Sequence, residues 1–122
     1  RTREFSLGGA TSGINGALWN MNRDDLQSLQ GSFERWIVHT NTPQAFHIQG
    51  VSFLIKCVNG STPLPEDQGW KDTVWVDNEV ELVVWFPQVA PEHFPYLYYS
   101  QTLEMADRGA MGQFVVRPAA MA

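Results

Sequence analysis

The three histidines are the residues of this chain whose chemistry can be tested first against a pattern. His39, His47 and His93 are widely separated, and no two show the short spacing, such as His-x-His or His-Glu-x-x-His, that brings imidazoles to one metal ion. His47 lies between Phe46 and Ile48, which favours a half-buried, hydrogen-bonded imidazole over a metal ligand. We expect His39, at a strand end, and His93, in a proline-flanked loop, at the surface. The histidines alone predict no metal centre.

Nucleophilic catalysis finds equally little support. A catalytic serine needs a histidine base and an acid that orients it. The neighbours of Ser100 are Tyr99 and Gln101, which supply no base, and the chain has no Gly-x-Ser-x-Gly turn. Glu104 and Asp107 are one helical turn apart, and we expect them to be solvated rather than to form a catalytic pair. Read one by one, the residues show no active site.

Cys57 is the only cysteine, so the chain cannot form an internal disulfide bond. Its apolar neighbours Ile55 and Val58 favour a buried, inert thiol. We therefore expect no thiol chemistry at this position.

The composition excludes several classes of protein. A length of 122 residues suits one domain, and a formal charge of −5 lacks the basic footprint of nucleic-acid binders. No apolar run approaches the ~20 residues that span a bilayer. Acidic residues gather in one stretch, for which a solvated face is the first interpretation and a docking site for a basic partner the second. They are Glu66, Asp67, Asp72, Asp77, Glu79 and Glu81.

The elements that position these residues are predicted to be short strands. Apolar residues alternate over residues 79–86 and over residues 51–58, and the second run ends at an Asn-Gly turn signal. Further strands are expected at 32–40, 46–50, 73–76, 94–100 and 113–117, with short edge strands at 4–7 and 17–20. The only helix predicted covers residues 102–108, and residues 60–69 are expected to form a surface loop. Many short strands separated by turns indicate an all-β sandwich or barrel with Greek-key connections, preceded by an entry segment over residues 1–16.

Two segments resemble the copper-binding signatures near the end of a multicopper oxidase. Residues 44–50 read Gln-Ala-Phe-His-Ile-Gln-Gly where the family reads His-Pro-Phe-His-Ile-His-Gly. Residues 99–110 correspond to the family's His-Cys-His, three residues, His-Glu, two residues, Gly and Met. Residues 69–73 match a family stretch that lies just before a strand. This resemblance implies a single cupredoxin domain, the Greek-key β-sandwich of that family.

The same resemblance identifies the positions where the family binds copper. The mononuclear-site positions hold Gln44, Ser100, Met105 and Ala110. The trinuclear-cluster positions hold His47, Gln49, Tyr99 and Gln101. Only His47 keeps a family ligand, and a serine hydroxyl cannot replace the thiolate that a blue-copper site requires. The resemblance therefore implies no catalytic residue, no cofactor and no metal ligand.

Within the family, residues 43–48, 70–77 and 100–109 look most like a copper-free branch that supports bacterial cell division. That resemblance implies a non-enzymatic scaffold in the periplasm, exported by the twin-arginine route, with division proteins as partners. It also implies that this chain is the third of three cupredoxin domains in a longer protein, which fits a first residue, Arg1, that is not methionine. Two alternatives stay open: a residual oxidase with other ligands, and a Cu(I)-handling module using Met105, Met111 and His47.

The former ligand positions should then serve packing and hydrogen bonding. We expect Tyr99 and Met105 to fill volume. The polar residues expected to form one network are Gln44, Gln49, Ser100 and Gln101. In the family this domain packs against the first domain, so the isolated chain should expose a contact face around His47, Gln49 and Tyr99 and tend to self-associate. The acidic stretch over residues 66–81 is a second candidate surface for division proteins.

Overall fold

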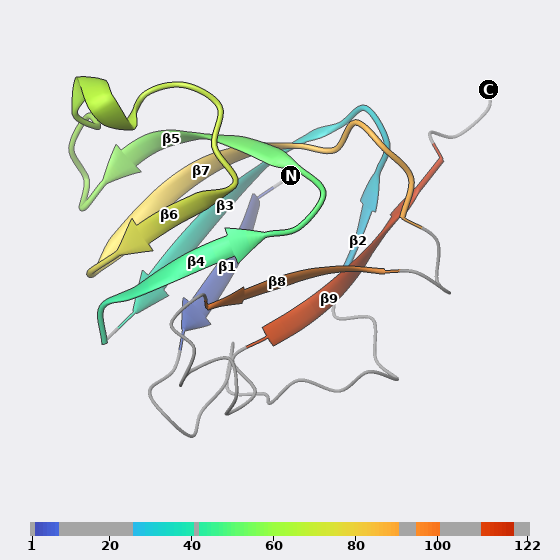
Figure 1. Cartoon of the computed structure of the whole chain (residues 1–122), viewed down its shortest axis with the longest axis horizontal. Coiled ribbons are helices and arrows are strands. Elements are labelled where there is room, and N and C mark those ends of the chain that lie inside the picture. Colours follow the sequence, from blue (N-terminus) through green and yellow to red (C-terminus); the bar gives the residue numbers. More distant parts are fainter. Residues whose placement is uncertain (1, 8–25, 41, 91–94, 101–110, 119–122) are drawn as a thin grey trace.

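The computed structural model describes residues 2–7, 26–40, 42–90, 95–100 and 111–118. They form two packed β-sheets. Sheet A has the strand order β1-β3-β7-β5, and sheet B has the order β2-β9-β8-β4-β6. In Figure 1, β4 and β8 of sheet B cross in front of β1 and β3 of sheet A. The all-β sandwich predicted from the strand pattern is confirmed.

The strands of sheet A are β1 (Thr2–Leu7), β3 (Phe33–Thr40), β7 (Glu79–Trp85) and β5 (Ser52–Val58). Those of sheet B are β2 (Leu26–Leu29), β9 (Met111–Arg117), β8 (Tyr96–Ser100), β4 (Gln44–Ile48) and β6 (Thr73–Val76). A short 3₁₀ helix, η1 (Pro65–Asp67), lies between β5 and β6. Two strand pairs are parallel, β1 with β3 and β2 with β9, whereas the other pairs are antiparallel.

Aromatic side chains fill the space between the sheets. Trp36 is fully buried and contacts the rings of Phe5, Tyr98, Phe86 and Phe114 at centroid distances of 4.5 to 6.3 Å. These rings come from both sheets. Packed aromatic pairs contribute roughly 0.5–1.5 kcal/mol each beyond the area that they bury. The core therefore fixes how the two sheets stack, and with it the position of β4 and β8.

Most predicted strands are observed within two residues of their expected ends. The strand expected at 46–50 instead begins at Gln44 and ends at Ile48. The strand at Leu26–Leu29 was not predicted, and the predicted loop over residues 60–69 contains η1. The predicted strand over residues 17–20 and the predicted helix over residues 102–108 lie outside the described residues. His93 lies outside them as well.

The prediction of a buried Cys57 is wrong, because β5 contains a bulge. Ile55 pairs with Leu82, but the next registered pair joins Cys57 to Glu81, so Lys56 is the extra residue. A bulge exchanges the two faces of a strand beyond it. Cys57 consequently lies beside Glu81 on the outer face of sheet A and is half-buried.

A buried ion pair ties β1 to the core. Glu34 occupies an inward-facing position of β3, and its carboxylate oxygen Oε1 accepts hydrogen bonds from Arg3 Nε at 2.6 Å and from Trp36 Nε1 at 2.9 Å. The Arg3 guanidinium also donates to the backbone carbonyl of Gln27. Burial raises the pKa of the Glu34 carboxyl, but the hydrogen bonds and the positive charge of Arg3 outweigh burial, so the pKa lies below its ordinary value.

Within the part of the chain that the structure describes, no helix has the length and apolar character needed to cross a membrane.

Candidate functional site

The two motif segments that resemble copper-binding signatures lie on neighbouring strands. β4 pairs antiparallel with β8, which places Phe46 opposite Ser100, His47 opposite Tyr99 and Ile48 opposite Tyr98. About fifty residues separate the two segments in the sequence. Their spatial proximity is therefore a property of the sheet, and it brings together the positions on β4 and β8 that the resemblance aligns with copper ligands of the family.

The alternation of β4 divides Gln44 and His47, the positions that align with copper ligands of the family, between two environments. Gln44 is fully buried and faces the interior of the sandwich, like Phe46 and Ile48. His47 lies on the outer face of sheet B with its side chain 16% exposed. Successive residues of a strand point to opposite faces. One strand can therefore serve an interior site and a surface site at the same time.

The Gln44 side chain is committed to the turn that precedes β4. Its amide nitrogen donates to Thr40 Oγ1 at 3.0 Å and to the Thr42 carbonyl at 3.1 Å. The Thr40 hydroxyl in turn bonds the Thr42 carbonyl at 2.6 Å. A buried amide is tolerated when such partners replace water. Gln44 therefore closes the β3–β4 turn, a role that the sequence pattern did not predict.

His47 is half-buried and hydrogen-bonded, as predicted. Its Nδ1 lies 3.0 Å from Thr73 Oγ1, and the Thr73 hydroxyl donates to Asp72 Oδ1 at 3.0 Å. With the one hydrogen of the Thr73 hydroxyl donated to Asp72, Nδ1 of His47 is the donor to Thr73 Oγ1, which leaves Nε2 facing away from this chain of hydrogen bonds. The Tyr99 ring packs edge-on against the imidazole with centroids 5.2 Å apart. At this position on β4 the structure orients a single imidazole, which by itself offers one nitrogen lone pair to a ligand.

The Gln49 side chain forms its hydrogen bond with the backbone of β8, not with another residue that aligns with a copper ligand of the family. The side-chain oxygen of Gln49 accepts from Leu97 N at 3.1 Å, and the backbone N–H of Gln49 donates to the Leu97 carbonyl at 2.8 Å. Gln49 thereby extends the pairing of β4 with β8 beyond the end of β4. The predicted polar network is described only in part: Gln44 and Gln49 bond different partners. The side chains of Ser100 and Gln101 lie outside the described residues, as do Met105 and Ala110.

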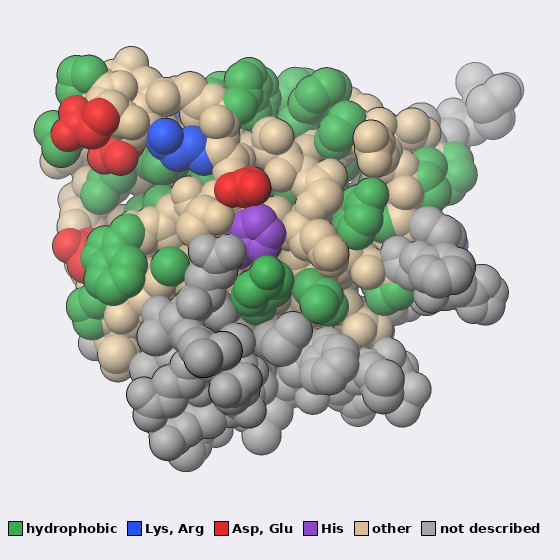
Figure 2. All heavy atoms as spheres, in the orientation of Figure 1, with side chains coloured by type: hydrophobic (Ala, Val, Ile, Leu, Met, Phe, Trp, Pro, Cys, Tyr) green, Lys and Arg blue, Asp and Glu red, His purple; other side chains and the backbone are tan. Residues whose placement is uncertain are grey.

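The surface of sheet B around His47 combines apolar, acidic and imidazole groups. Figure 2 shows a histidine near the middle of this face, with an acidic side chain beside it and apolar side chains on several sides. Trp75 of β6 is 60% exposed on this sheet. Among the described residues, no three His, Cys, Asp or Glu side chains are grouped so that they could hold a metal ion.

A second group of charges lies on the opposite sheet and was not predicted. Glu81 of β7 accepts from Arg35 at 2.7 Å and lies 3.3 Å from Lys56 Nζ. The hydrogen bond from Arg35 is the main reason that the pKa of the Glu81 carboxyl lies below its ordinary value, and the same bond raises the pKa of Arg35. His39 sits at the end of the same sheet, half-exposed, with Nδ1 3.0 Å from Glu79. These are cross-strand surface pairs, which typically contribute little to stability.

Residues 2–120 match the sequence profile of the family described as multicopper oxidase. The chain belongs to the multicopper oxidase family. Its β-sandwich is the cupredoxin-like domain of that family, as the resemblance of the two motif segments implies.

Several highly similar curated relatives are named cell division protein FtsP. The FtsP of Sodalis glossinidius is 90% identical over 118 residues, which is 97% of this chain and 25% of that protein. The FtsP of Yersinia pestis is 65% identical over 115 residues, 94% of this chain and 24% of that protein. The chain thus spans about a quarter of the length of these curated relatives.

Solved structures of multicopper oxidases share the fold. A laccase-like multicopper oxidase, CueO, from an Ochrobactrum species superimposes with a TM-score of 0.91 at 32% identity, covering 95% of this chain and 30% of that chain. A multicopper oxidase from Pediococcus acidilactici gives a TM-score of 0.88 at 26% identity, covering 97% and 26%.

Proposed function

We propose that this domain is a non-enzymatic, copper-free scaffold that supports bacterial cell division through contacts with division proteins. It is the third of three cupredoxin domains in a longer periplasmic protein, exported folded by the twin-arginine route. Its ancestor was an oxidase, and the residues that held copper have taken structural roles.

The observation that carries this proposal is the hydrogen bonding of Gln44 and Gln49. Both occupy family histidine positions. The Gln44 amide is held by Thr40 and Thr42, and the Gln49 amide by the Leu97 backbone. A blue-copper site requires a thiolate and two imidazoles, and the cluster requires several imidazoles. The Gln44 side-chain nitrogen donates two hydrogen bonds and, as an amide nitrogen, offers no lone pair to a metal, while the Gln49 side-chain oxygen already accepts from Leu97 N, so these residues do not fit copper.

The relatives support the biological part of the proposal. Proteins of 58–90% identity from several bacteria carry the name cell division protein FtsP. The oxidase structures share the fold at much lower identity. We therefore assign this domain the division role of its close relatives rather than the oxidase chemistry of its distant ones.

A copper titration tests the proposal. The purified chain and the FtsP of Sodalis glossinidius are incubated with Cu(II) and with Cu(I), desalted, and assayed by metal-counting mass spectrometry, visible absorption and EPR. We expect no stoichiometric copper and no thiolate or cluster spectrum in either protein. Tight copper with a thiolate-like or cluster spectrum would restore the oxidase alternative. Colourless stoichiometric Cu(I) would restore the copper-handling alternative.

A matched variant shows whether the assay can detect the lost site. Gln44→His, Ser100→Cys and Met105→His together restore the thiolate and the two imidazoles of the mononuclear position. If the scaffold still has the family geometry, this triple variant gains blue absorption while the unaltered chain does not. In a second experiment, done in cells, the domain of the Sodalis relative that corresponds to this chain is exchanged for an unrelated domain. A loss of division under stress, without any change in the copper content of the cells, would support the scaffold role.

A further inference from the structure

The edges of the two sheets meet at one point and then separate. Phe53 of β5 and Lys71, just before β6, exchange two backbone hydrogen bonds: Phe53 N to Lys71 O at 2.8 Å, and Lys71 N to Phe53 O at 2.9 Å. Beyond this bridge, β5 continues along the edge of sheet A and β6 along the edge of sheet B. The open side of the sandwich is therefore a wedge between two strand edges.

The backbone of β6 directs polar groups into this wedge. The Asp72 carbonyl accepts from Ile48 N at 3.1 Å, so the backbone polar groups of Asp72 point toward β4. Because the direction of these groups alternates along a strand, those of Val74 and Val76 also point toward β4. Thr73 and Trp75 consequently direct their N–H and C=O groups away from β4, on the same side as Lys71. Among the described residues, these four groups have no hydrogen-bond partner. An edge strand of this kind is a template for one more strand.

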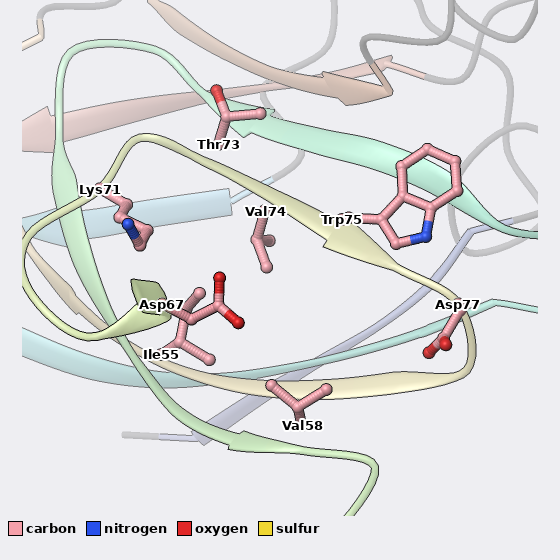
Figure 3. Close-up of a pocket in the computed structure, with 8 residues that line it drawn as sticks. All are labelled: Ile55, Val58, Asp67, Lys71, Thr73, Val74, Trp75 and Asp77. Carbon is pink, nitrogen blue, oxygen red and sulfur yellow. The ribbon is translucent and has the colours of Figure 1, made fainter. Parts of the chain in front are cut away.

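The wedge contains an open pocket of about 310 Å³ beside β6, lined by both apolar and charged residues. In Figure 3, Val74 points into the space that Ile55 and Val58 line from β5, whereas Thr73 and Trp75 lie on the other side of β6. Val74 and Ile55 are buried, so the floor of the cavity is apolar. A volume of this size is at the lower end of ligand pockets, roughly 300–1,000 Å³. It suits aliphatic side chains of an added strand.

The rim of the wedge is acidic. Asp67 and Asp77 line the cavity, and Glu66 is exposed on η1. Lys71 is the cation of this rim, and its Nζ lies 3.4 Å from the carbonyl of Glu66 rather than beside a carboxylate. Within the described part of the chain, none of these three carboxylates forms an ion pair. Figure 2 shows acidic side chains gathered at the end of the face that carries η1.

We propose that the β6 edge binds an extended segment of a partner protein by strand addition. The occupant has aliphatic side chains at the alternate positions that face the same way as Val74 and enter the pocket, and it carries basic side chains because the rim of the pocket is acidic. Main-chain bonds to Thr73 and Trp75 supply affinity, and the alternating side chains supply specificity. β5 is the poorer template because its bulge after Ile55 interrupts the edge.

This inference rests on the proposal that the domain acts through protein contacts, but its test involves no copper. The copper titration can therefore detect bound copper while the peptide still binds by strand addition. Likewise, the peptide can fail to bind while the chain remains free of copper.

The first experiment uses a fluorescent, end-blocked peptide with the sequence Lys-Val-Lys-Val-Lys-Val-Lys and the purified chain. Fluorescence anisotropy should show saturable binding, and NMR shift changes should concentrate at β6 and η1. Two peptides carry N-methyl groups on alternate residues, one on the lysines and one on the valines. Strand addition requires that one of these peptides lose binding and the other keep it. Equal effects of the two methylation patterns, or binding of a block-scrambled peptide Val₃Lys₄ as strong as that of the alternating one, would overturn the proposal.

Protein variants locate the site. Trp75→Pro removes the outward N–H that an added strand would use, and Trp75→Ala is its control for loss of the side chain. We expect Trp75→Pro to bind roughly tenfold more weakly than Trp75→Ala. The double variant Asp67→Asn with Asp77→Asn should weaken peptide binding at low salt, and the weakening should be smaller at high salt because salt screens the charges. The control Glu4→Gln, at an exposed position on β1, should leave peptide binding unchanged. Equal binding by the proline and alanine variants places the peptide elsewhere and refutes the site.

Discussion

Removal of the Arg3 guanidinium should destabilise this domain more than removal of any exposed charge. Arg3→Met keeps an apolar stem of similar length but leaves the Glu34 carboxylate without its charged partner. The two side chains are only 11% and 4% exposed, and the pair distance is 2.6 Å. Removing one partner of a buried pair costs about 3–5 kcal/mol, because the other charge stays buried without compensation. We expect the lower end, ~3 kcal/mol, since the Trp36 hydrogen bond to Glu34 remains.

The assay is thermal and urea unfolding followed by circular dichroism at pH 7. A loss of ~3 kcal/mol corresponds to a fall in Tm of roughly 10 °C or more for a domain of this size. Arg35→Met is the matched control: Arg35 is also on sheet A and also paired with a glutamate, but its side chain is 48% exposed. Its effect should be much smaller. The double variant Arg3→Met with Glu34→Leu should recover most of the lost stability, because an apolar pair can replace a buried ion pair.

The pH dependence separates this mechanism from simple loss of packing. The Glu34 pKa in the folded state lies below its ordinary value of 4.5, so the pair stabilises the fold above that pH. This stabilisation is lost as the pH falls through the folded-state pKa. In Arg3→Met, burial without the cation raises the pKa of the Glu34 carboxyl, so protonation relieves the buried charge, and the stability difference between the two proteins should shrink as the pH falls toward 4.5 and below it. A difference under 1 kcal/mol at pH 7, or one that does not change with pH, would refute the reasoning.

Three further predictions concern single positions. Gly50 has φ +75°, and a Cβ there would lie 2.4 Å from the Tyr96 ring, so Gly50→Ala should lower the free energy of unfolding by about 3 kcal/mol. Gly60→Ala is the control, with a similar φ but open space, and should cost about 1 kcal/mol. Urea unfolding of both variants measures the difference. Iodoacetamide should label Cys57 in the folded chain, more slowly than in urea, because the bulge turns the thiol outward; complete protection would contradict the half-buried position. Size-exclusion chromatography at increasing concentration should show self-association that Tyr99→Lys reduces, and a strict monomer at high concentration would count against an exposed contact face.

The sequence by itself determined the fold class and the strand set. Period-two alternation predicted β5 and β7 almost to the residue, because each strand has one face against the core and the pattern is local. The spacing of the two motif segments also determined the family. Identities at single positions, such as glutamine at the first family histidine, Gln44, were sufficient to predict that the copper ligands have changed.

The tertiary structure decided which side chains meet. β2 has four residues and becomes a strand only because it pairs with β9, about ninety residues away, so no local pattern predicted it. The bulge that turns Cys57 outward depends on the pairing with β7. From the sequence, Glu34 would be an unpaired charge on the core face of β3. Its partner, Arg3, lies thirty-one residues earlier in the chain, on β1. Likewise, the wedge beside β6 exists because two sheet edges share one bridge and then diverge. Non-local pairing sets each of these features, and a one-dimensional pattern contains no information on which distant residue will be the partner.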